Sequence, residues 1–195
     1  MTGETIFWNW FVENRECFDG FQPGQEAVLD LLHDALLRYR DRLVFELSQP
    51  KDGIRELVIS ADGLRELFPA VEKLCAAAPT IPGWKITAFR PRMSLDFRLK
   101  HDGRVFDPDE VWFHPISEDG AFDLILYVPP FSEDERSAIV NGCYILLDMA
   151  LGERDVVTRL RYLDHHPLPS DPEAKGLLPF RNLPEVFDRA LGRTS

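Results

Sequence analysis

The residues best suited to do chemistry are arginines, grouped in one stretch of an otherwise acidic chain. Between Lys85 and Arg104 basic side chains outnumber acidic ones, and Arg154, Arg159 and Arg161 follow later. A guanidinium group presents a planar fork of N–H donors that suits carboxylate or phosphate groups. These residues predict an anion-binding site, with two histidines able to exchange protons beside it: Arg90, Arg92, Arg98, Arg159, Arg161, His114 and His165. The alternative is that the arginines pair with acidic residues on adjacent strands.

Two histidine-containing clusters combine metal-ligand types but have simpler interpretations. The first comprises His101, Asp102, Asp107, Asp109, Glu110 and His114. Its Asp107-Pro108-Asp109 run is explained equally well as a turn, because Asp and Pro favour turns. The second is Asp164-His165-His166, where adjacent histidines on an extended segment would point to opposite sides. We therefore predict no metal site.

The familiar catalytic signatures are absent from the sequence. It contains no Gly-rich phosphate loop, Gly-x-Ser-x-Gly elbow, paired-cysteine zinc spacing or His-Glu-x-x-His motif. We predict no cofactor, and whether the protein is an enzyme stays open, with a non-enzymatic role favoured.

Composition and charge narrow the class of protein. The chain has 195 residues, of which 45% are hydrophobic, and a formal net charge of −11. The negative electrostatic field of such a protein repels nucleic acid and anionic membranes and favours a basic partner. No apolar run could cross a bilayer, and Met1-Thr2-Gly3-Glu4 lacks the layout of a secretion signal. The widely spaced Cys17, Cys75 and Cys143 indicate free thiols and a cytoplasmic location.

The pattern of apolar residues and turns predicts a single domain over residues 1–195. Residues 4–40 read as two helices, residues 95–106 as a hairpin, and residues 165–195 as a loop and a short helix capped at Asn182. Two strand–strand–helix–strand units occupy residues 43–92 and 111–164. Their predicted strands are Leu43–Leu47, Ile54–Ser60 and Trp84–Arg90, then Val111–Ile116, Phe122–Val128 and Val156–Leu163. The first helix begins at Leu64 or at Pro69, and the second at a capping box starting with Ser132 and ends at Gly152.

The two units resemble one unit written twice. Each predicted hairpin turn carries Asp-Gly, and aligning Gly53 with Gly120 places residues 56–59 on residues 123–126, matched in type. We expect an α+β protein with largely antiparallel strands, in one sheet or two abutting sheets, and helices on one face. The duplication further predicts that the two halves superimpose.

Four segments carry a resemblance to a known group of proteins. They are Phe7–Phe11, Ile59–Gly63, Trp84–Arg90 and Leu147–Glu153. Together they resemble a family of small uncharacterised bacterial proteins, over most of the chain. The resemblance implies a bacterial, cytosolic α+β protein and carries no activity or catalytic residue.

These observations favour a non-enzymatic module that binds a protein or peptide partner, or a second copy of itself, on a broad sheet face. The alternative is a small-molecule enzyme or sensor with an arginine-lined cleft between the two repeats. A purely structural module is the third possibility.

Overall fold

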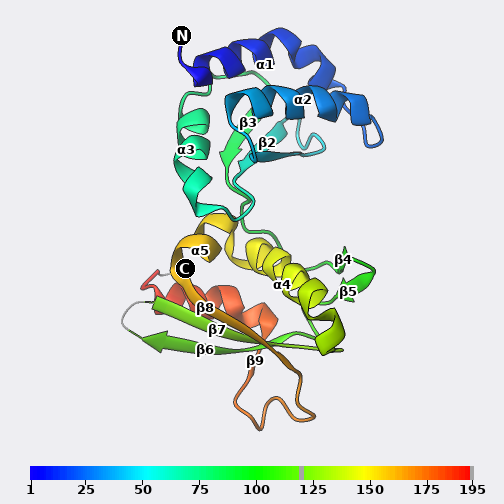
Figure 1. Ribbon diagram of the computed structural model, residues 1–195, viewed down its shortest axis with the longest axis vertical. Coiled ribbons are helices and arrows are strands. Elements are labelled where there is room, and N and C mark those ends of the chain that lie inside the picture. Colours follow the sequence, from blue (N-terminus) through cyan, green and yellow to red (C-terminus); the bar gives the residue numbers. More distant parts are fainter. Residues whose placement is uncertain (119–120, 194–195) are drawn as a thin grey trace. The chain divides into compact units, whose positions relative to one another are not determined.

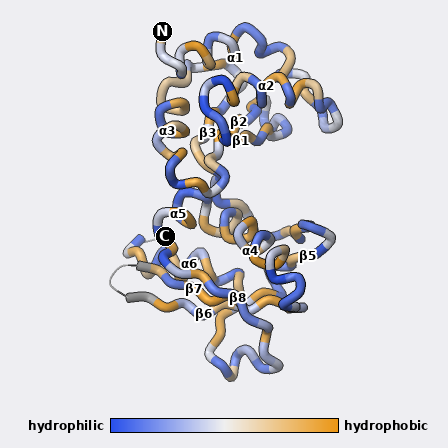
Figure 2. The backbone as a smooth tube through the Cα atoms, viewed as in Figure 1, coloured by the Kyte–Doolittle hydropathy of each residue, from blue (hydrophilic) through white to orange (hydrophobic). Residues whose placement is uncertain are grey.

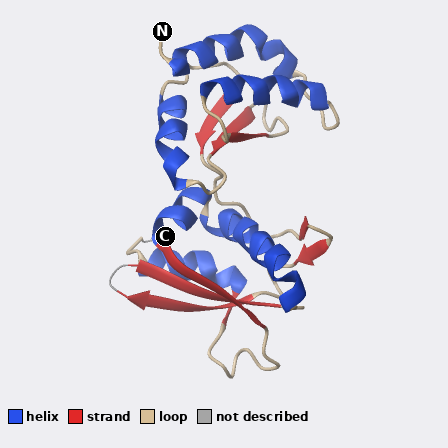
Figure 3. Cartoon of the chain, viewed as in Figure 1, coloured by secondary structure: helices blue, strands red, loops and turns tan. Residues whose placement is uncertain are grey.

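The computed structural model describes residues 1–118 and 121–193. The chain divides into two compact units, Met1–Arg90 and Pro91–Ser195, which we call unit 1 and unit 2 and describe separately. Each has its own sheet with helices packed on it, so the expected α+β class is confirmed (Figure 3). Among the described helices, none combines the length and apolar character that a membrane crossing requires.

Unit 1 places a pair of helices on a three-stranded sheet (Figure 1). Its elements are α1 (Gly3–Asp19), α2 (Glu26–Tyr39), β1 (Val44–Leu47), β2 (Arg55–Ser60), a 3-10 turn (Arg65–Leu67), α3 (Phe68–Ala76) and β3 (Trp84–Ala88). The central strand β2 runs antiparallel to β1 and parallel to β3. The helical pair and the first strand–strand–helix–strand unit are therefore as predicted.

Local chemistry explains two of these boundaries. Asp52 and Gly53 both have positive φ, 52° and 76°, which suits the tight turn between β1 and β2. Pro69 lies in the first turn of α3, where its missing N–H removes no helical hydrogen bond. The α-helix therefore begins near Pro69, and the 3-10 turn Arg65–Leu67 that runs directly into it accounts for the alternative, a tight first turn after Leu64.

Aromatic side chains of α1 supply much of the unit 1 core. Phe7, Trp8, Phe11 and Phe18 are buried. The Trp8 indole Nε1 donates to the Leu74 carbonyl at 2.7 Å, which satisfies its buried N–H and joins α1 to α3. The buried Arg55 donates to the Ser48 carbonyl at 2.9 Å and the Phe21 carbonyl at 3.0 Å, so it ties the α1–α2 connection to the hairpin.

Unit 2 contains a small hairpin and a four-stranded sheet covered by helices. The hairpin is β4 (Leu99–His101) and β5 (Arg104–Phe106). The rest is β6 (Trp112–Glu118), β7 (Ala121–Val128), a 3-10 turn (Glu133–Glu135), α4 (Arg136–Leu151), α5 (Glu153–Arg159), β8 (Leu160–Pro167), β9 (Leu178–Pro179), a second 3-10 turn (Phe180–Asn182) and α6 (Leu183–Ala190). The strand order is β8-β7-β6-β9, with β7 antiparallel to β6 and parallel to β8.

Several predicted boundaries of unit 2 were wrong. Residues 156–159 form the end of α5 rather than a strand, so the third strand begins at Leu160 and includes His165 and His166. The Ser132 side chain makes no capping hydrogen bond and a 3-10 turn precedes α4, so the capping box fails; Asn182 likewise makes no side-chain cap. Gly152, with φ of 84°, does end α4 as predicted. The Asp119-Gly120 turn lies outside the described residues.

The two sheets share one topology, an antiparallel hairpin followed by a helix and a parallel third strand. At the aligned acidic positions of the two central strands, Glu56 pairs with Lys85 at 2.8 Å and Asp123 with Arg161 at 2.6 Å. In both cases the basic partner lies on or beside the third strand. The superposition of the two halves stays a prediction.

Side chains alternate across β7 and define the two faces of the unit 2 sheet. Phe122, Leu124, Leu126 and Val128 are buried in the cluster that α4 and α6 also enter. Asp123, Ile125 and Tyr127 lie on the opposite, helix-free face, because successive strand residues point to opposite sides.

Candidate functional site

Most of the predicted anion-binding arginines are engaged by carboxylates of their own unit. In unit 1, Arg90 contacts Glu46 at 2.6 Å and Asp62 at 3.0 Å. In unit 2, Arg98 contacts Asp107 at 2.7 Å, and Arg161 forms a two-pronged pair with Asp123 at 2.6 and 3.0 Å. The Arg161 fork holds the pKa of the Asp123 carboxyl below its ordinary value. Arg159 is exposed at the end of α5 and has no ion pair with a described residue.

Arg92 is the most constrained member of the set. Its guanidinium donates to both oxygens of Asp188 at 2.6 and 2.8 Å, to Asp155 at 3.2 Å, and to the Leu151 carbonyl at 2.8 Å. The hydrogen bond from Arg92 lowers the pKa of Asp188, and Arg193 and then Arg92 lower that of Asp155. These pairs fix α6 against α5. Arg92 is thus charge-paired, although its partners lie on helices and not on the adjacent strands that the charge-pairing alternative named. The arginine-lined cleft stays a prediction.

The two predicted histidines lie on opposite faces of the unit 2 sheet. His114 is exposed on β6, on the helix-free face. His165 is only 4% exposed on β8, and its ring lies 6.5 Å from that of Tyr144 on α4. Burial lowers the pKa of His165 to about 4. Its imidazole is therefore neutral near pH 7 but too weakly basic to act as an efficient general base there. Within residues 1–118 and 121–193, no group of three or more side chains is arranged to hold a metal ion.

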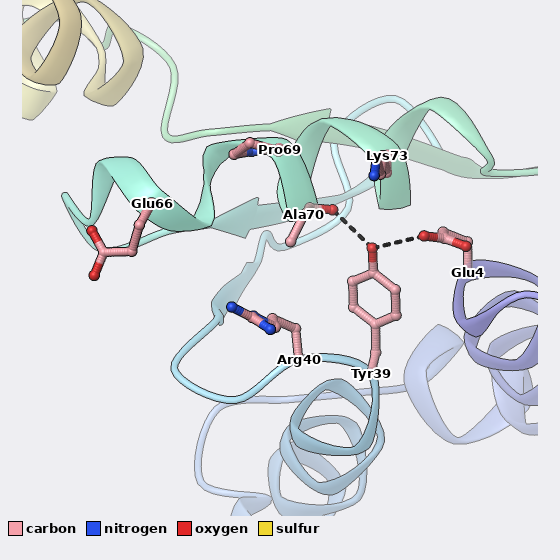
Figure 4. Close-up of a pocket in the computed structure, with 7 residues that line it drawn as sticks. All are labelled: Glu4, Tyr39, Arg40, Glu66, Pro69, Ala70 and Lys73. Carbon is pink, nitrogen blue, oxygen red and sulfur yellow. Dashed lines mark hydrogen bonds between the residues drawn. The ribbon is translucent and has the colours of Figure 1, made fainter.

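A charged pocket lies where α1, α2 and α3 meet in unit 1 (Figure 4). The Tyr39 hydroxyl stands at its centre, 3.1 Å from both the Glu4 carboxylate and the Ala70 carbonyl. Burial, and then the hydrogen bond to Glu4, raise the pKa of Tyr39 to about 12. The phenol therefore stays protonated and joins the end of α2 to the start of α1 and to α3.

An apolar groove between α1 and α2 adjoins this junction. It is lined by Gly3, Ile6, Phe7, Trp10, Ala35, Arg38 and Tyr39, and we call it the α1–α2 groove. Its volume is about 140 Å³. A side chain at Gly3 would come within 3.2 Å of the Tyr39 ring, so glycine permits the close approach of the two helices at this end.

Each of the two helices carries an exposed apolar side chain in the groove or one turn from it. Ile6 is 57% exposed on α1, and Leu31 is 47% exposed on α2, one helical turn before Ala35. Figure 2 shows hydrophobic and hydrophilic residues interspersed along both helices. Neither residue is among the buried residues of its helix, so about half of each apolar side chain is left in contact with water.

The two helices that form the groove carry more acidic than basic residues. The two helices carry Arg15 and Arg38 against Glu4, Glu13, Glu16, Asp19, Glu26, Asp30 and Asp34. Arg15 is itself paired with Asp19 at 3.1 Å. The helices that form this apolar groove are therefore acidic, while the groove itself is lined by one cationic residue, Arg38. Sequence reasoning missed the groove, although Ile6 and Leu31, which are apolar but lie off the helical stripe, were a usable signal.

Comparison with protein-family models, curated proteins and solved structures finds no match to this chain. The functional argument therefore depends on the chemistry of the described residues.

Proposed function

We propose that the protein is a binding module that recognises a protein partner through the α1–α2 groove. The single observation that carries the proposal is the exposure of Ile6 in an apolar groove that Phe7 and Trp10 also line, with exposed Leu31 one helical turn from the groove residue Ala35. Two helices with an apolar groove between them form the usual receptor for the apolar face of a third helix. Tryptophan is also among the residues that contribute most to protein–protein affinity.

Charge selects the kind of partner. The acidic side chains of the two helices favour a basic helix, whose apolar stripe would lie on Ile6, Trp10 and Leu31 while its Lys and Arg residues face carboxylates of α1 and α2. The net charge of −11 would also speed the encounter with a basic partner.

The pairing of the arginines supports a binding module over an enzyme. An anion site built from Arg90, Arg92 or Arg161 would have to displace carboxylates that already occupy those guanidinium groups. A small-molecule role through these residues is therefore the weaker proposal.

Calorimetric titration with a designed helical peptide tests the proposal. The probe is a Leu/Lys peptide with leucines at i, i+3, i+4 and i+7, and its control has the same composition in scrambled order. We expect the amphipathic peptide to bind, and binding to weaken at about 1 M salt, where the Debye length is roughly 3 Å. The scrambled peptide separates groove binding from simple charge attraction.

Two aspartate substitutions on α1 provide the matched comparison. Ile6→Asp should weaken binding by at least about tenfold, because it places a charge where apolar surface must be buried. Val12→Asp, at a residue that is 45% exposed on the same helix but does not line the groove, should leave binding unchanged. Equal affinity of both variants, or of both peptides, would refute the α1–α2 groove as the binding surface.

A further inference from the structure

A second pocket lies on the helix-free face of the unit 2 sheet. It is lined by His114, Tyr127, Pro167, Pro169, Lys175 and Leu177 and has a volume of about 350 Å³. His114 belongs to β6 and Tyr127 to β7. In the register of these two strands, His114 lies opposite Ile125, and Trp112 lies opposite Tyr127. We call it the β6–β7 pocket.

The topology of the sheet builds the remaining wall. Strands β8 and β9 are consecutive in the chain but lie at opposite edges of the order β8-β7-β6-β9. The segment 168–177 must therefore cross the end of β7 and β6, as the loop below the sheet in Figure 1 does. This crossing carries Pro169, Lys175 and Leu177 to the pocket. Gly176, with φ of 70°, permits the turn back toward β9.

The lining combines a flat apolar surface with cationic and polar donors. The Tyr127 ring lies 5.8 Å from the His166 ring at an interplanar angle of 30°, and two prolines and Leu177 add apolar walls. Lys175 is exposed and makes no ion pair with a described carboxylate, and His114 contributes an exposed imidazole. Unlike Arg92, Arg98 and Arg161 of this unit, which are held by carboxylates, the Lys175 ammonium is available to a ligand.

Two aspartates on this face, Asp123 and Asp164, already have basic or polar partners, and Asp123 is paired with Arg161 at 2.6 Å. Asp164 accepts from Arg136 at 3.1 Å and from the Tyr162 hydroxyl at 3.2 Å, and it contacts His166 Nε2 at 3.1 Å. Its charge is thus largely compensated by its neighbours. In register, Ile125 separates Asp164 from His114.

We propose that the β6–β7 pocket binds a small planar aromatic carboxylate. The ring would stack on Tyr127 between the prolines, and the carboxylate would accept from Lys175 and His114. Planar apolar surface with one or two convergent polar groups is the usual composition of a small-molecule site. This site is separate from the α1–α2 groove, so either proposal can fail while the other stands.

The test is an NMR titration of the full chain with 4-hydroxybenzoate. Two comparison compounds remove one feature each: 4-hydroxybenzamide lacks the charge, and acetate lacks the ring. We expect saturable shifts at Tyr127, His114 and the indole of Trp112, which lies beside Tyr127 in the sheet. The amide should bind at least about tenfold more weakly because the charge-assisted hydrogen bonds are lost. Acetate should cause no saturable shift.

Substitutions assign the binding to the pocket. Lys175→Gln should reduce the affinity for 4-hydroxybenzoate by about tenfold or more. Tyr127→Leu removes the stacking surface and should also reduce the affinity for 4-hydroxybenzoate. Lys100→Gln, at another exposed lysine of unit 2, is the control and should have no effect. Absence of saturable shifts, equal binding of acetate, or unchanged affinity of Lys175→Gln would each overturn the proposal.

Discussion

The close approach of a phenylalanine ring to a glycine of helix α4 in unit 2 offers a demanding test of the structure. Gly142 lies in the middle of α4, where the ring of Phe106 from β5 rests on it. A Cβ atom at this position would lie 2.2, 2.3 and 2.8 Å from three carbons of that ring. Phe106 is itself only 2% exposed. We therefore predict that Gly142→Ala destabilises unit 2.

The size of the effect follows from two opposing contributions. Replacing glycine by alanine inside a helix normally stabilises it by about 1 kcal/mol. Carbon atoms in contact normally lie about 3.5–4.0 Å apart, so the Phe106 ring must move by more than an ångström. Overpacking of this kind costs about 1–3 kcal/mol, and losing the ring from the core altogether would cost about 3–5 kcal/mol. We expect a net loss of about 2 kcal/mol.

The assay must report on unit 2 alone, since the chain divides into two compact units. Urea unfolding followed at the indole NMR signal of Trp112 meets this need, because Trp8, Trp10 and Trp84 belong to unit 1. Asn141→Ala, at an exposed neighbour on α4, is the control and should be neutral or slightly stabilising. In a Phe106→Leu background, Gly142→Ala should lose most of its cost. An increase in stability with Phe106 present would refute the packing described for α4 and β5.

Two further predictions concern ion pairs and thiols in the folded protein. Arg92→Met should lower the stability of unit 2 by about 1–3 kcal/mol at pH 7, because partly buried Asp188 loses its two-pronged donor and Asp155 keeps only Arg193. Since the pKa values of Asp155 and Asp188 are lowered on folding, their contribution is complete above the ordinary carboxyl pKa and is lost as the pH falls through the lowered values. The difference in free energy of unfolding between Arg92→Met and the wild type, measured by urea titration, should therefore become smaller below about pH 4. The control Arg189→Met removes an exposed ion pair and should change the stability little at any pH. For the thiols, burial raises the pKa of Cys75 and of Cys143 to about 12. At pH 8 a disulfide reagent should therefore modify exposed Cys17 first and the other two only on unfolding. A fast-reacting thiol in a folded Cys17→Ser variant would contradict this.

The correct predictions from sequence concern short-range chemistry. The Asp-Gly turn at residues 52–53 and the helix end at Gly152 depend on the positive φ that glycine adopts without steric cost. Pro69 marks the start of α3 because proline has no N–H to donate. Each of these signals is a steric or covalent property of Gly or Pro, whereas the hydrogen-bonded caps predicted at Ser132 and Asn182 do not form.

The wrong predictions concern segments where packing overrides local preference. Val156, Val157 and Thr158 are β-branched and favour a strand, yet they lie in α5, where Val156 packs into the unit 2 core. Strand β9 has only two residues and forms because β6 lies beside it. Propensity differences of about 1 kcal/mol or less per residue cannot decide such cases against burial.

The sequence by itself determined the α+β class, the two strand–strand–helix–strand units and the acidic balance of the chain, because alternation, turn residues and charge are local properties. Only the tertiary structure decided which arginines are neutralised: Arg92 pairs with Asp188, 96 residues away. It also brought Ile6 beside α2, and Lys175 beside His114 and Tyr127, to form the two candidate binding surfaces. The physical reason is that side-chain pairing and pocket shape depend on contacts between distant segments, and their energies are settled only when the whole core packs.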